Sequence, residues 1–419
     1  MANVSSSNGL EKRPKLRFPG FDEPWCSHKF SAVFSFLQNN TLSRAELDAT
    51  GDVLDIHYGD VLIKYGSILD ATDNTIPHII SGHESTNYDY LQDGDIIVAD
   101  TAEDKTVGKT IELLNISGRK IEAGLHTVPC RPLFPFASMY LGYYMNTPHY
   151  HKQFIPLMQG IKVLSISKGN ISKTEISSPQ TIAEQEKISR FLYLLDQRAA
   201  AQSKIIDALK KYKRGVVRSL LSPEHCGLKE VQWQCDTIGN LGSFIKGAPL
   251  SKADISETGT PFILYGELYT TYHEVITSVV RKTEAVVEQV YHSMVGDVLI
   301  PTSGETSEEI STASCVMLPG VILAGDLNIF RSTKIDGRIM SYILNHIVNG
   351  NIARIAQGKS VVHVQASEIS KIEISYPDPE TQIRIIKVLE AISNRIESCE
   401  KELNHLTKMR NSLLQQLFI

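Results

Sequence analysis

Two stretches of this chain carry the same spacing of apolar residues, and the duplication limits what the chain can fold into. They run from Thr181 to Leu221 and from Glu380 to Ile419. Each member of the second stretch lies 197 residues after its counterpart, as Ile385 follows Ile188. The repeating apolar positions are Ile188, Leu192, Leu195, Ile206, Leu209 and Leu220 in the first stretch, and Ile385, Leu389, Ile392, Leu403, Leu406 and Leu417 in the second.

Alternating steps of four and three residues place these side chains in one narrow seam, which is the pattern of a coiled coil. A helix of about forty residues is roughly 60 Å long, and a small domain cannot cover such a seam. We therefore predict that the two helices pair antiparallel within one chain. Even the basic interruption of the seam, Lys213, recurs as Arg410. The alternative is a pair of ordinary surface helices, or a coiled coil that joins separate chains.

The duplication continues outside the helices. Trp25 opens the first half as Trp233 opens the second, and a Gly-Asp turn before an apolar run occurs at Gly94-Asp95 and at Gly296-Asp297. A Gly-Asp turn leading into such a run predicts the start of a strand. The sequence between these landmarks differs between the halves. The resulting division is a disordered leader over 1–14, a first mixed α/β domain over 15–179, a long helix over 180–222, a second domain over 223–378 and a second long helix over 379–419.

Length and composition agree with a soluble protein of several domains. The chain has 419 residues, of which 42% are hydrophobic and 21% charged, which is ordinary for a globular protein. Its net charge of −5 does not exclude DNA binding, because local basic patches set phosphate affinity. The six cysteines lack C-x-x-C pairs and predict reduced thiols. We see neither a signal peptide nor an apolar run long enough to span a bilayer, and we expect a cytoplasmic protein.

Motifs of catalysis are missing from the sequence. Two Gly-Lys-Ser/Thr tripeptides, at Gly108 and Gly358, lack the earlier glycine that a phosphate-binding loop needs. The pair His149 and His151 has no supporting metal ligands nearby. Nucleophile elbows, nuclease clusters and dinucleotide-binding turns do not occur. We predict that the chain has no catalytic site, no metal site and no cofactor of its own.

Charged and aromatic residues in the variable loops are the candidates for binding. Arginine and lysine neutralise phosphates, and arginine also reads base edges. For each single residue, a solvated surface is the competing interpretation. The DNA-binding candidates are Lys64, Tyr65, Lys105, Lys109, Arg119, Lys246, Tyr269, Arg281, Arg331 and Lys334. A further basic cluster, Lys210 to Arg218, either complements the helix dipole or faces phosphates.

Four features of the sequence belong together: the lead-in from Lys15 to Phe21, the two Trp-led openings, the Gly-Asp strand starts and the helix entries at Glu184-Gln185 and Thr381-Gln382. Together they resemble the specificity (S) subunits of type I restriction–modification systems. The resemblance covers nearly the whole chain. The second entry departs from the first, because it has threonine in place of glutamate and one residue fewer after the proline.

The resemblance implies an α+β fold with two duplicated target-recognition domains joined by two long helices, which form a pseudo-twofold antiparallel coiled coil. It also implies that the chain reads a bipartite, asymmetric DNA target and recruits two modification subunits and the restriction subunits. S-adenosylmethionine, ATP and Mg2+ then belong to those partners. The alternative function is a coiled-coil scaffold that does not read DNA.

Overall fold

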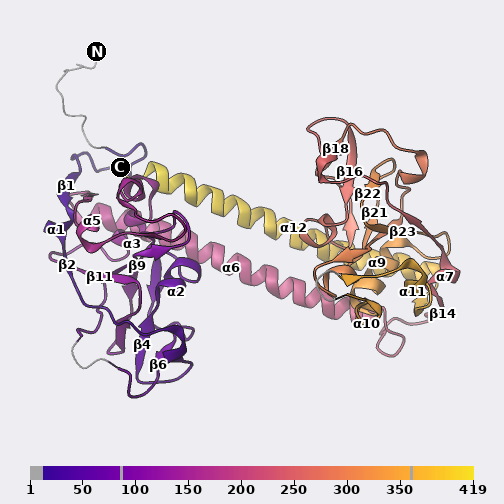
Figure 1. The fold of residues 1–419 in the computed structure, drawn as a ribbon, viewed down its shortest axis with the longest axis horizontal. Helices are drawn as coiled ribbons and strands as arrows, with labels where there is room; N and C mark the ends of the chain where they lie inside the picture. Colours follow the sequence, from indigo (N-terminus) through magenta and orange to yellow (C-terminus); the bar gives the residue numbers. More distant parts are fainter. Residues whose placement is uncertain (1–12, 85–87, 359–361) are drawn as a thin grey trace, which may run out of the picture. The chain divides into compact units, whose positions relative to one another are not determined.

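The computed structural model describes residues 13–84, 88–358 and 362–419 (Figure 1). Most of the predicted leader, and Lys359 and Ser360 of the second Gly-Lys-Ser tripeptide, lie outside these residues. The chain divides into two compact units. Unit 1 comprises residues 1–203 and 401–419, and unit 2 comprises residues 204–400. Each unit therefore contains one globule and parts of both long helices.

Unit 1 is built on a five-stranded sheet with the order β2-β11-β7-β9-β5 and a four-stranded sheet with the order β10-β4-β6-β3. In the larger sheet, β7 is antiparallel to β11 and β9, whereas β5 is parallel to β9. The elements of the globule are β1 (Cys26–Lys29), α1 (Phe30–Val33), β2 (Phe34–Phe36), β3 (Leu47–Asp48), β4 (Val53–Ile56), α2 (Tyr58–Ile63), β5 (Ile68–Asp70), β6 (His78–Ile79), β7 (Ile96–Ala99), β8 (Thr101–Ala102), β9 (Thr110–Leu114), β10 (Lys120–Ala123), β11 (Thr127–Pro132), α3 (Tyr140–Met145), α4 (Pro148–His151), β12 (Leu164–Ser165), α5 (Lys168–Ile171) and β13 (Glu175–Ser178).

Unit 2 repeats this plan. Its five-stranded sheet has the order β15-β23-β19-β21-β17 and its smaller sheet the order β18-β16-β22. Here β19 is antiparallel to β23 and β21, and β17 is parallel to β21. The elements are β14 (Trp233–Thr237), α7 (Ile238–Leu241), β15 (Ser243–Lys246), β16 (Thr260–Leu264), α8 (Glu267–Thr270), β17 (Val275–Ile276), β18 (Arg281–Thr283), β19 (Asp297–Pro301), β20 (Ser303–Gly304), β21 (Ser314–Val316), β22 (Ile322–Ala324), β23 (Leu327–Arg331), α9 (Gly337–His346), α10 (Asn349–Ile355), β24 (Val362–His363), α11 (Ala366–Ile369) and β25 (Glu373–Pro377).

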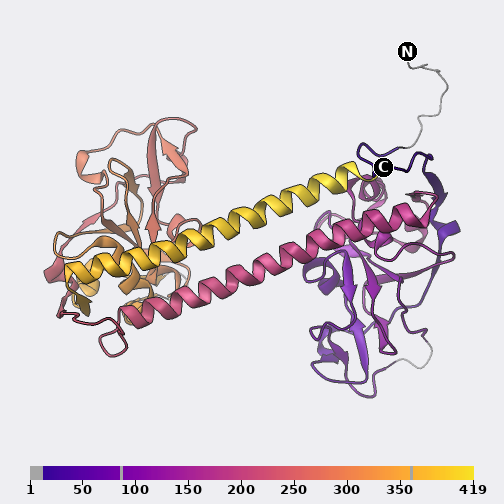
Figure 2. The same ribbon diagram turned by 180° about the vertical axis from the view of Figure 1, so that it is seen from behind.

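The two long helices are α6 (Ile182–Leu220) and α12 (Pro379–Gln416), and they pack side by side (Figures 1 and 2). The start of each helix meets the end of the other. In unit 1, Ile188 of α6 shares a core with Leu414 of α12. In unit 2, Val217 of α6 shares a core with Ile385 of α12. The predicted antiparallel coiled coil is therefore confirmed.

The predicted seam residues are all buried or half-buried. Towards the end of α6, however, the most buried residues are Val217 and Leu221, and Leu221 lies one position after the predicted Leu220. A straight α-helix drifts by about 20° per heptad against a strict 3.5-residue repeat. The drift matters at this end because the last turns of α6 pack on the globule of unit 2 as well as on α12.

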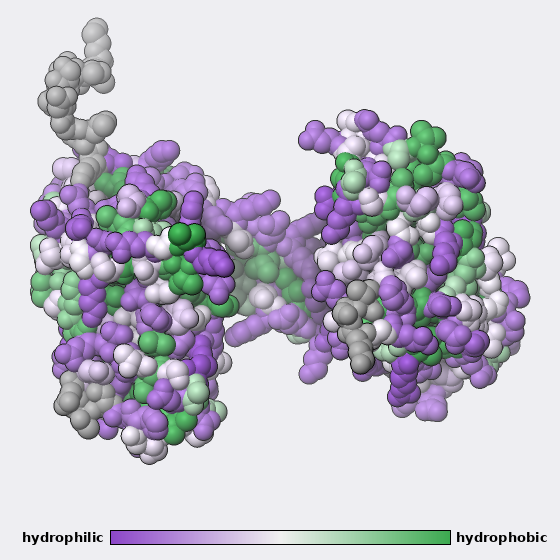
Figure 3. Space-filling model, viewed as in Figure 1, coloured by the Kyte–Doolittle hydropathy of each residue, from purple (hydrophilic) through white to green (hydrophobic). Residues whose placement is uncertain are grey.

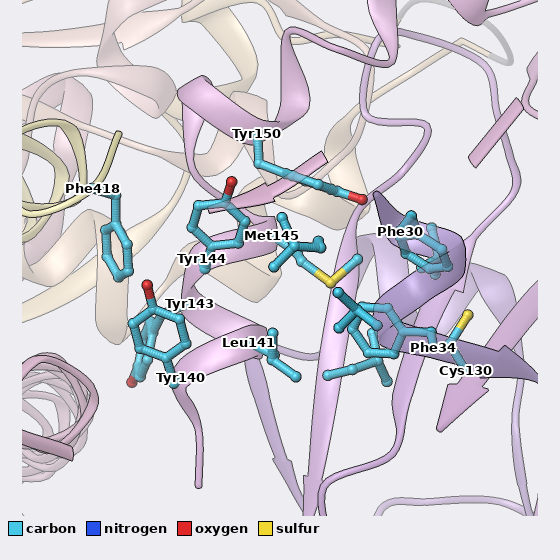
Figure 4. Close-up of a cluster of buried hydrophobic side chains, with 14 of the residues drawn as sticks. Phe30, Phe34, Cys130, Tyr140, Leu141, Tyr143, Tyr144, Met145, Tyr150 and Phe418 are labelled. Carbon is cyan, nitrogen blue, oxygen red and sulfur yellow. The ribbon is translucent and has the colours of Figure 1, made fainter. Parts of the chain in front are cut away.

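Each globule is completed by the C-terminal end of one long helix. In unit 1, Phe418 is 1% exposed. Its ring lies 5.7 Å from that of Tyr140 and 5.9 Å from that of Tyr144, between centroids (Figure 4). In unit 2 the position that corresponds to Phe418 is Leu221, which is also buried in the core. The globules therefore depend on the helices for part of their hydrophobic cores.

The basic interruptions of the seam, Lys213 and Arg410, lie where a helix meets a globule. Lys213 Nζ is 2.7 Å from Glu274 Oε2 in unit 2. Arg410 Nε donates to Asp196 Oδ1 in unit 1, and Tyr143 donates its hydroxyl to the same carboxylate at 2.9 Å. The buried Lys213 and the half-buried Arg410 thus each have a carboxylate partner, as a charge removed from water requires. The basic residues mark the two docking points in the duplicated fold.

Glutamine at the start of each long helix makes the same hydrogen bonds in both units. Gln185 accepts from the Ala137 N–H at 2.9 Å and donates to the Pro179 carbonyl. Gln382 accepts from the Asp336 N–H at 2.9 Å and donates to the Pro377 carbonyl. The preceding residue differs between the units.

That preceding position binds a different partner in each unit. Glu184 receives two hydrogen bonds from Arg17 of the lead-in, whereas Thr381 bonds to Asp378. The departure seen in the sequence therefore changes the partners of this position and leaves the hydrogen bonds of the following glutamine in place.

One buried polar cluster in unit 1 has an apolar counterpart in unit 2. Asn40 Nδ2 donates to Asp55 Oδ2 at 2.8 Å and to Glu122 Oε2 at 3.1 Å. Burial first, and Glu122 as a further cause, raise the pKa of Asp55 to about 7. In unit 2 the corresponding strands contribute a purely apolar cluster that includes Phe262 and Ala324.

Replacing Asp55 by asparagine should change how stability depends on pH. Because the folded-state pKa lies above the unfolded value, the wild type loses stability as pH rises from about 4 to about 7, and the loss is constant above that range. A shift of this size corresponds to about 4 kcal/mol. The melting temperature of Asp55→Asn, relative to the wild type, should therefore rise between pH 5 and pH 7.5.

The exposed turn residue Asp104 supplies the control for this experiment. Hydrogen bonds from Thr106 lower the pKa of Asp104, so Asp104→Asn should show no such gain. A constant difference between Asp55→Asn and the wild type across this pH range would contradict the assignment.

Candidate nucleic-acid interface

One edge of unit 1 is formed by segments that are far apart in the sequence. Strand β12 pairs with β8, with Ser165 opposite Thr101. The Ile166 N–H donates to the Asp100 carbonyl at 2.8 Å, and the Asp100 N–H donates to the His126 carbonyl at 3.1 Å. We call this the first edge: residues 100–106, 124–126 and 159–166.

Unit 2 contains the same arrangement. Strand β20 pairs with β24, the Val364 N–H donates to the Thr302 carbonyl at 2.9 Å, and the Thr302 N–H donates to the Asp326 carbonyl at 2.7 Å. We call this the second edge: residues 302–305, 326, 357–358 and 362–364. The shared hydrogen bonds show that one backbone plan supports both edges.

The side chains on the two edges differ. On the first edge the ring of Tyr58, at the start of α2, packs against His126 with centroids 5.2 Å apart. On the second edge an acidic residue, Asp326, occupies the place of His126 and accepts a hydrogen bond from Ser303 at 2.8 Å. The two edges therefore share a backbone arrangement but present different hydrogen-bond donors and acceptors. This suits two binding sites of the same kind that recognise different ligands.

Three candidate residues of unit 1 come together at the end of α2. Lys109 Nζ donates to the carbonyls of Leu62 and Tyr65, at 2.9 and 2.8 Å. Lys64 Nζ donates to the Thr75 carbonyl and lies 5.2 Å from the centre of the Tyr65 ring. Tyr65 itself is only 5% exposed, and burial raises its pKa. In this conformation the two lysines donate to backbone carbonyls beside the end of α2, and the Tyr65 ring is buried there.

The other two candidates of unit 1 lie apart in the sequence and in the fold. Lys105 is exposed in the turn that follows β8, and it therefore belongs to the first edge. Arg119 is exposed in the turn before β10, where it lines a small pocket of the smaller sheet together with His78. Of the two, Lys105 lies on the duplicated edge.

Arg331 belongs to the duplicated architecture of unit 2. Its guanidinium donates to Asp297 at 2.8 and 2.7 Å, and to the His292 carbonyl at 3.3 Å. Arg131 makes the same bidentate contact with Asp95 in unit 1, at 2.9 and 2.7 Å. A pair that recurs in both units with the same geometry favours a structural role for this arginine.

The remaining candidates of unit 2 lie on its surface. Arg281 Nε donates to the buried carboxylate of Glu267 at 2.9 Å, and Lys334 Nζ donates to the Asn240 carbonyl at 2.7 Å. Lys246 is exposed on β15, and Tyr269 is half-buried in α8. That any of the ten candidates binds DNA stays a prediction.

A charge pattern along the sequence identifies basic residues that the candidate set omits. Residues 123–174 contain no aspartate or glutamate, although the whole chain has 47 such residues. The equivalent stretch of unit 2, residues 324–372, contains three such residues, Asp326, Asp336 and Glu368. The total charge hides this asymmetry, because acidic residues elsewhere outweigh it. The exposed lysines of the stretch in unit 1 are Lys152, Lys162, Lys168 and Lys173.

The described residues lack both a metal-binding cluster and a helix that could span a membrane. In residues 13–84, 88–358 and 362–419, no three His, Cys, Asp or Glu side chains are grouped to hold a metal ion. Among the helices of that same part of the chain, none is both long and apolar enough to cross a membrane. The prediction that the chain has no cofactor of its own stays a prediction.

Comparison with known proteins gives consistent matches. Residues 230–408 match the model of the type I restriction modification DNA specificity domain. A protein of Methanocaldococcus jannaschii, provisionally named the type I restriction enzyme MjaX specificity subunit, is 23% identical over 77% of each chain.

Two solved structures share the fold, each with a TM-score of 0.58. One is a type I restriction-modification S subunit from M. genitalium, which is 15% identical. The other is a chain from a study of complex assembly and conformational transition of the type I R-M system, which is 14% identical. Each alignment covers 97% of this chain and 99% of the other. At this level of identity the likeness concerns the fold.

Proposed function

We propose that this chain, which belongs to the type I restriction–modification specificity subunits, binds double-stranded DNA and reads a bipartite, asymmetric target. The observation that carries the proposal is the pair of duplicated edges. Each edge has the same backbone hydrogen bonds, but Tyr58 and His126 stand on the first and Ser303 and Asp326 on the second. Two edges with the same backbone arrangement but different side chains suit two unlike half-sites, because base edges are distinguished by their donors and acceptors.

The long helices have the second role in this proposal. They dock into both globules, so their length sets the number of unread base pairs between the half-sites. The chain scaffolds two modification subunits and the restriction subunits in the cytoplasm and catalyses no reaction itself. S-adenosylmethionine, ATP and Mg2+ are bound by these partners.

Mapping methylated adenines in cells that contain the chain and its modification subunits tests the proposal. We expect one motif with two unlike halves separated by a spacer of fixed length. The purified complex should then retain a duplex with this motif at moderate salt and release one with either half scrambled. The chain alone should transfer no methyl group from S-adenosylmethionine.

Equal retention of every duplex by an assembled complex would support the scaffold function instead. Methylation by the chain alone would contradict its non-catalytic role.

A further inference from the structure

The first edge carries a hairpin whose base is held firmly. The Gln159 N–H donates to the Ser165 carbonyl at 2.9 Å, and the Ser165 N–H donates to the Gln159 carbonyl at 2.8 Å. Gly160 has φ of +113°, and a Cβ there would lie 1.9 Å from the Val163 carbonyl oxygen. Only glycine permits so tight a turn. Below the base, Phe154 is fully buried.

The tip of the hairpin is apolar and exposed. Ile161 is 99% exposed and Val163 is 53% exposed, while Lys162 between them is exposed as well. Neither apolar side chain contributes to the core of its own unit. Unit 1 has other apolar residues at its surface (Figure 3), but this pair shares an exposed tip with a cation.

The charge of the stretch that contains the hairpin indicates which kind of partner covers the tip. The hairpin lies within the acid-free stretch 123–174, and the exposed Lys152, Lys168 and Lys173 lie in the same stretch. Three acidic residues of the first edge, Asp100, Glu103 and Asp104, belong to the β8 segment, but the stretch that carries the hairpin is basic throughout. Such a basic stretch attracts a polyanion. The same surface fits an ordinary protein partner less well, because interfaces between proteins are depleted of lysine.

We propose that this hairpin enters the minor groove of the bound duplex, with Lys162 on a phosphate and Ile161 and Val163 against sugars and base edges. Apolar side chains at an exposed tip are used in this way by proteins that bind the minor groove. The inference rests on the proposed function and assigns the contact to named residues of the first edge.

Equilibrium binding of the assembled complex to its mapped duplex, measured over a range of salt concentrations, tests the hairpin. The double variant I161A/V163A should lose affinity by roughly tenfold, because it removes apolar contact from the complex. Lys162→Ala should weaken binding to all duplexes and reduce the slope of log affinity against log salt by about one. Both variants should melt like the wild type, because the changed side chains are exposed.

Val286→Ala is the matched control. Val286 is 97% exposed in unit 2, but its neighbours Glu284 and Glu288 are acidic, so its removal should leave affinity unchanged. If the wild type binds its duplex and both hairpin variants keep its affinity and salt slope, the hairpin inference is wrong while the proposed function stands.

Two further results separate the possibilities. Loss of the modification subunits, with unchanged DNA affinity of the complexes that still assemble, would assign the tip to a protein partner and overturn the inference. A wild-type complex that binds no duplex would instead contradict the proposed function itself.

Discussion

Exchanging residues 26–178 for the corresponding globule of a type I specificity subunit is expected to change one half of the methylated target and to leave the other half unchanged. The exchanged segment contains the whole first edge, including Tyr58, His126 and the hairpin at 159–165. It leaves α6, α12 and the second edge as they are. Mapping of methylated adenines reads both halves and the spacer in one experiment.

The exchange also keeps the contacts of Glu184 at the start of α6. Arg17 and Trp25 both donate to Glu184, and all three residues lie outside the exchanged segment. The exchange is expected to affect stability through the hydrophobic core, because the retained Phe418 packs on Tyr140 and Tyr144 of the replaced globule.

A second chimera should therefore also carry the donor's residues equivalent to 413–419. If the first chimera is unstable, the second should restore the melting temperature and show the same new half-site. A change in both halves of the target, in either chimera, would contradict two independent readers.

Much of the fold could be predicted from the sequence, because the spacing of its apolar residues has a direct structural consequence. A seam such as Ile188, Leu192 and Leu195 requires a helix and a partner, and the copy 197 residues later supplies that partner. The Gly-Asp turns at Gly94 and Gly296 also precede strands, namely β7 and β19. These patterns are local, and each depends on few neighbours.

The candidate site was harder to predict, because the sequence does not show which partner a charge finds. Lys109 and Arg331 have the residue types of DNA-binding side chains, yet their partners here are the carbonyls of Leu62 and Tyr65 and the carboxylate of Asp297. Those partners come from other elements, so only the tertiary structure brings them together.

The absence of acidic residues from 123–174 was visible in the sequence. It supports a binding surface only together with the exposed apolar tip that the structure places within that stretch. The same holds for Ile161, whose exposure no pattern of periodicity predicts.

Lengthening both long helices by one turn is expected to lengthen the spacer of the DNA target and to preserve both half-sites. The turn should be inserted after Ala199 in α6 and after Lys401 in α12. The ion pair between Arg198 and Glu402, at 2.7 Å, joins the helices at this level, so matched insertions leave it intact. One turn adds about 5.4 Å to each helix, which is comparable to one or two base-pair steps of about 3.4 Å.

Mapping of methylated adenines again provides the measurement, and the insertion in α6 alone is the informative partial variant. It shifts α6 against α12, so the basic residues that dock the helices lose register: Arg410 with Asp196 in unit 1 or Lys213 with Glu274 in unit 2. A lower melting temperature should therefore accompany it, unlike the matched insertion.

An insertion of equal length in the loop between α6 and β14 should change neither the spacer nor the half-sites, because both helices keep their length. If the matched insertion left the spacer unchanged, the helices would not set the spacing. If it altered the bases that are read, the edges would not act independently of the helices that connect them.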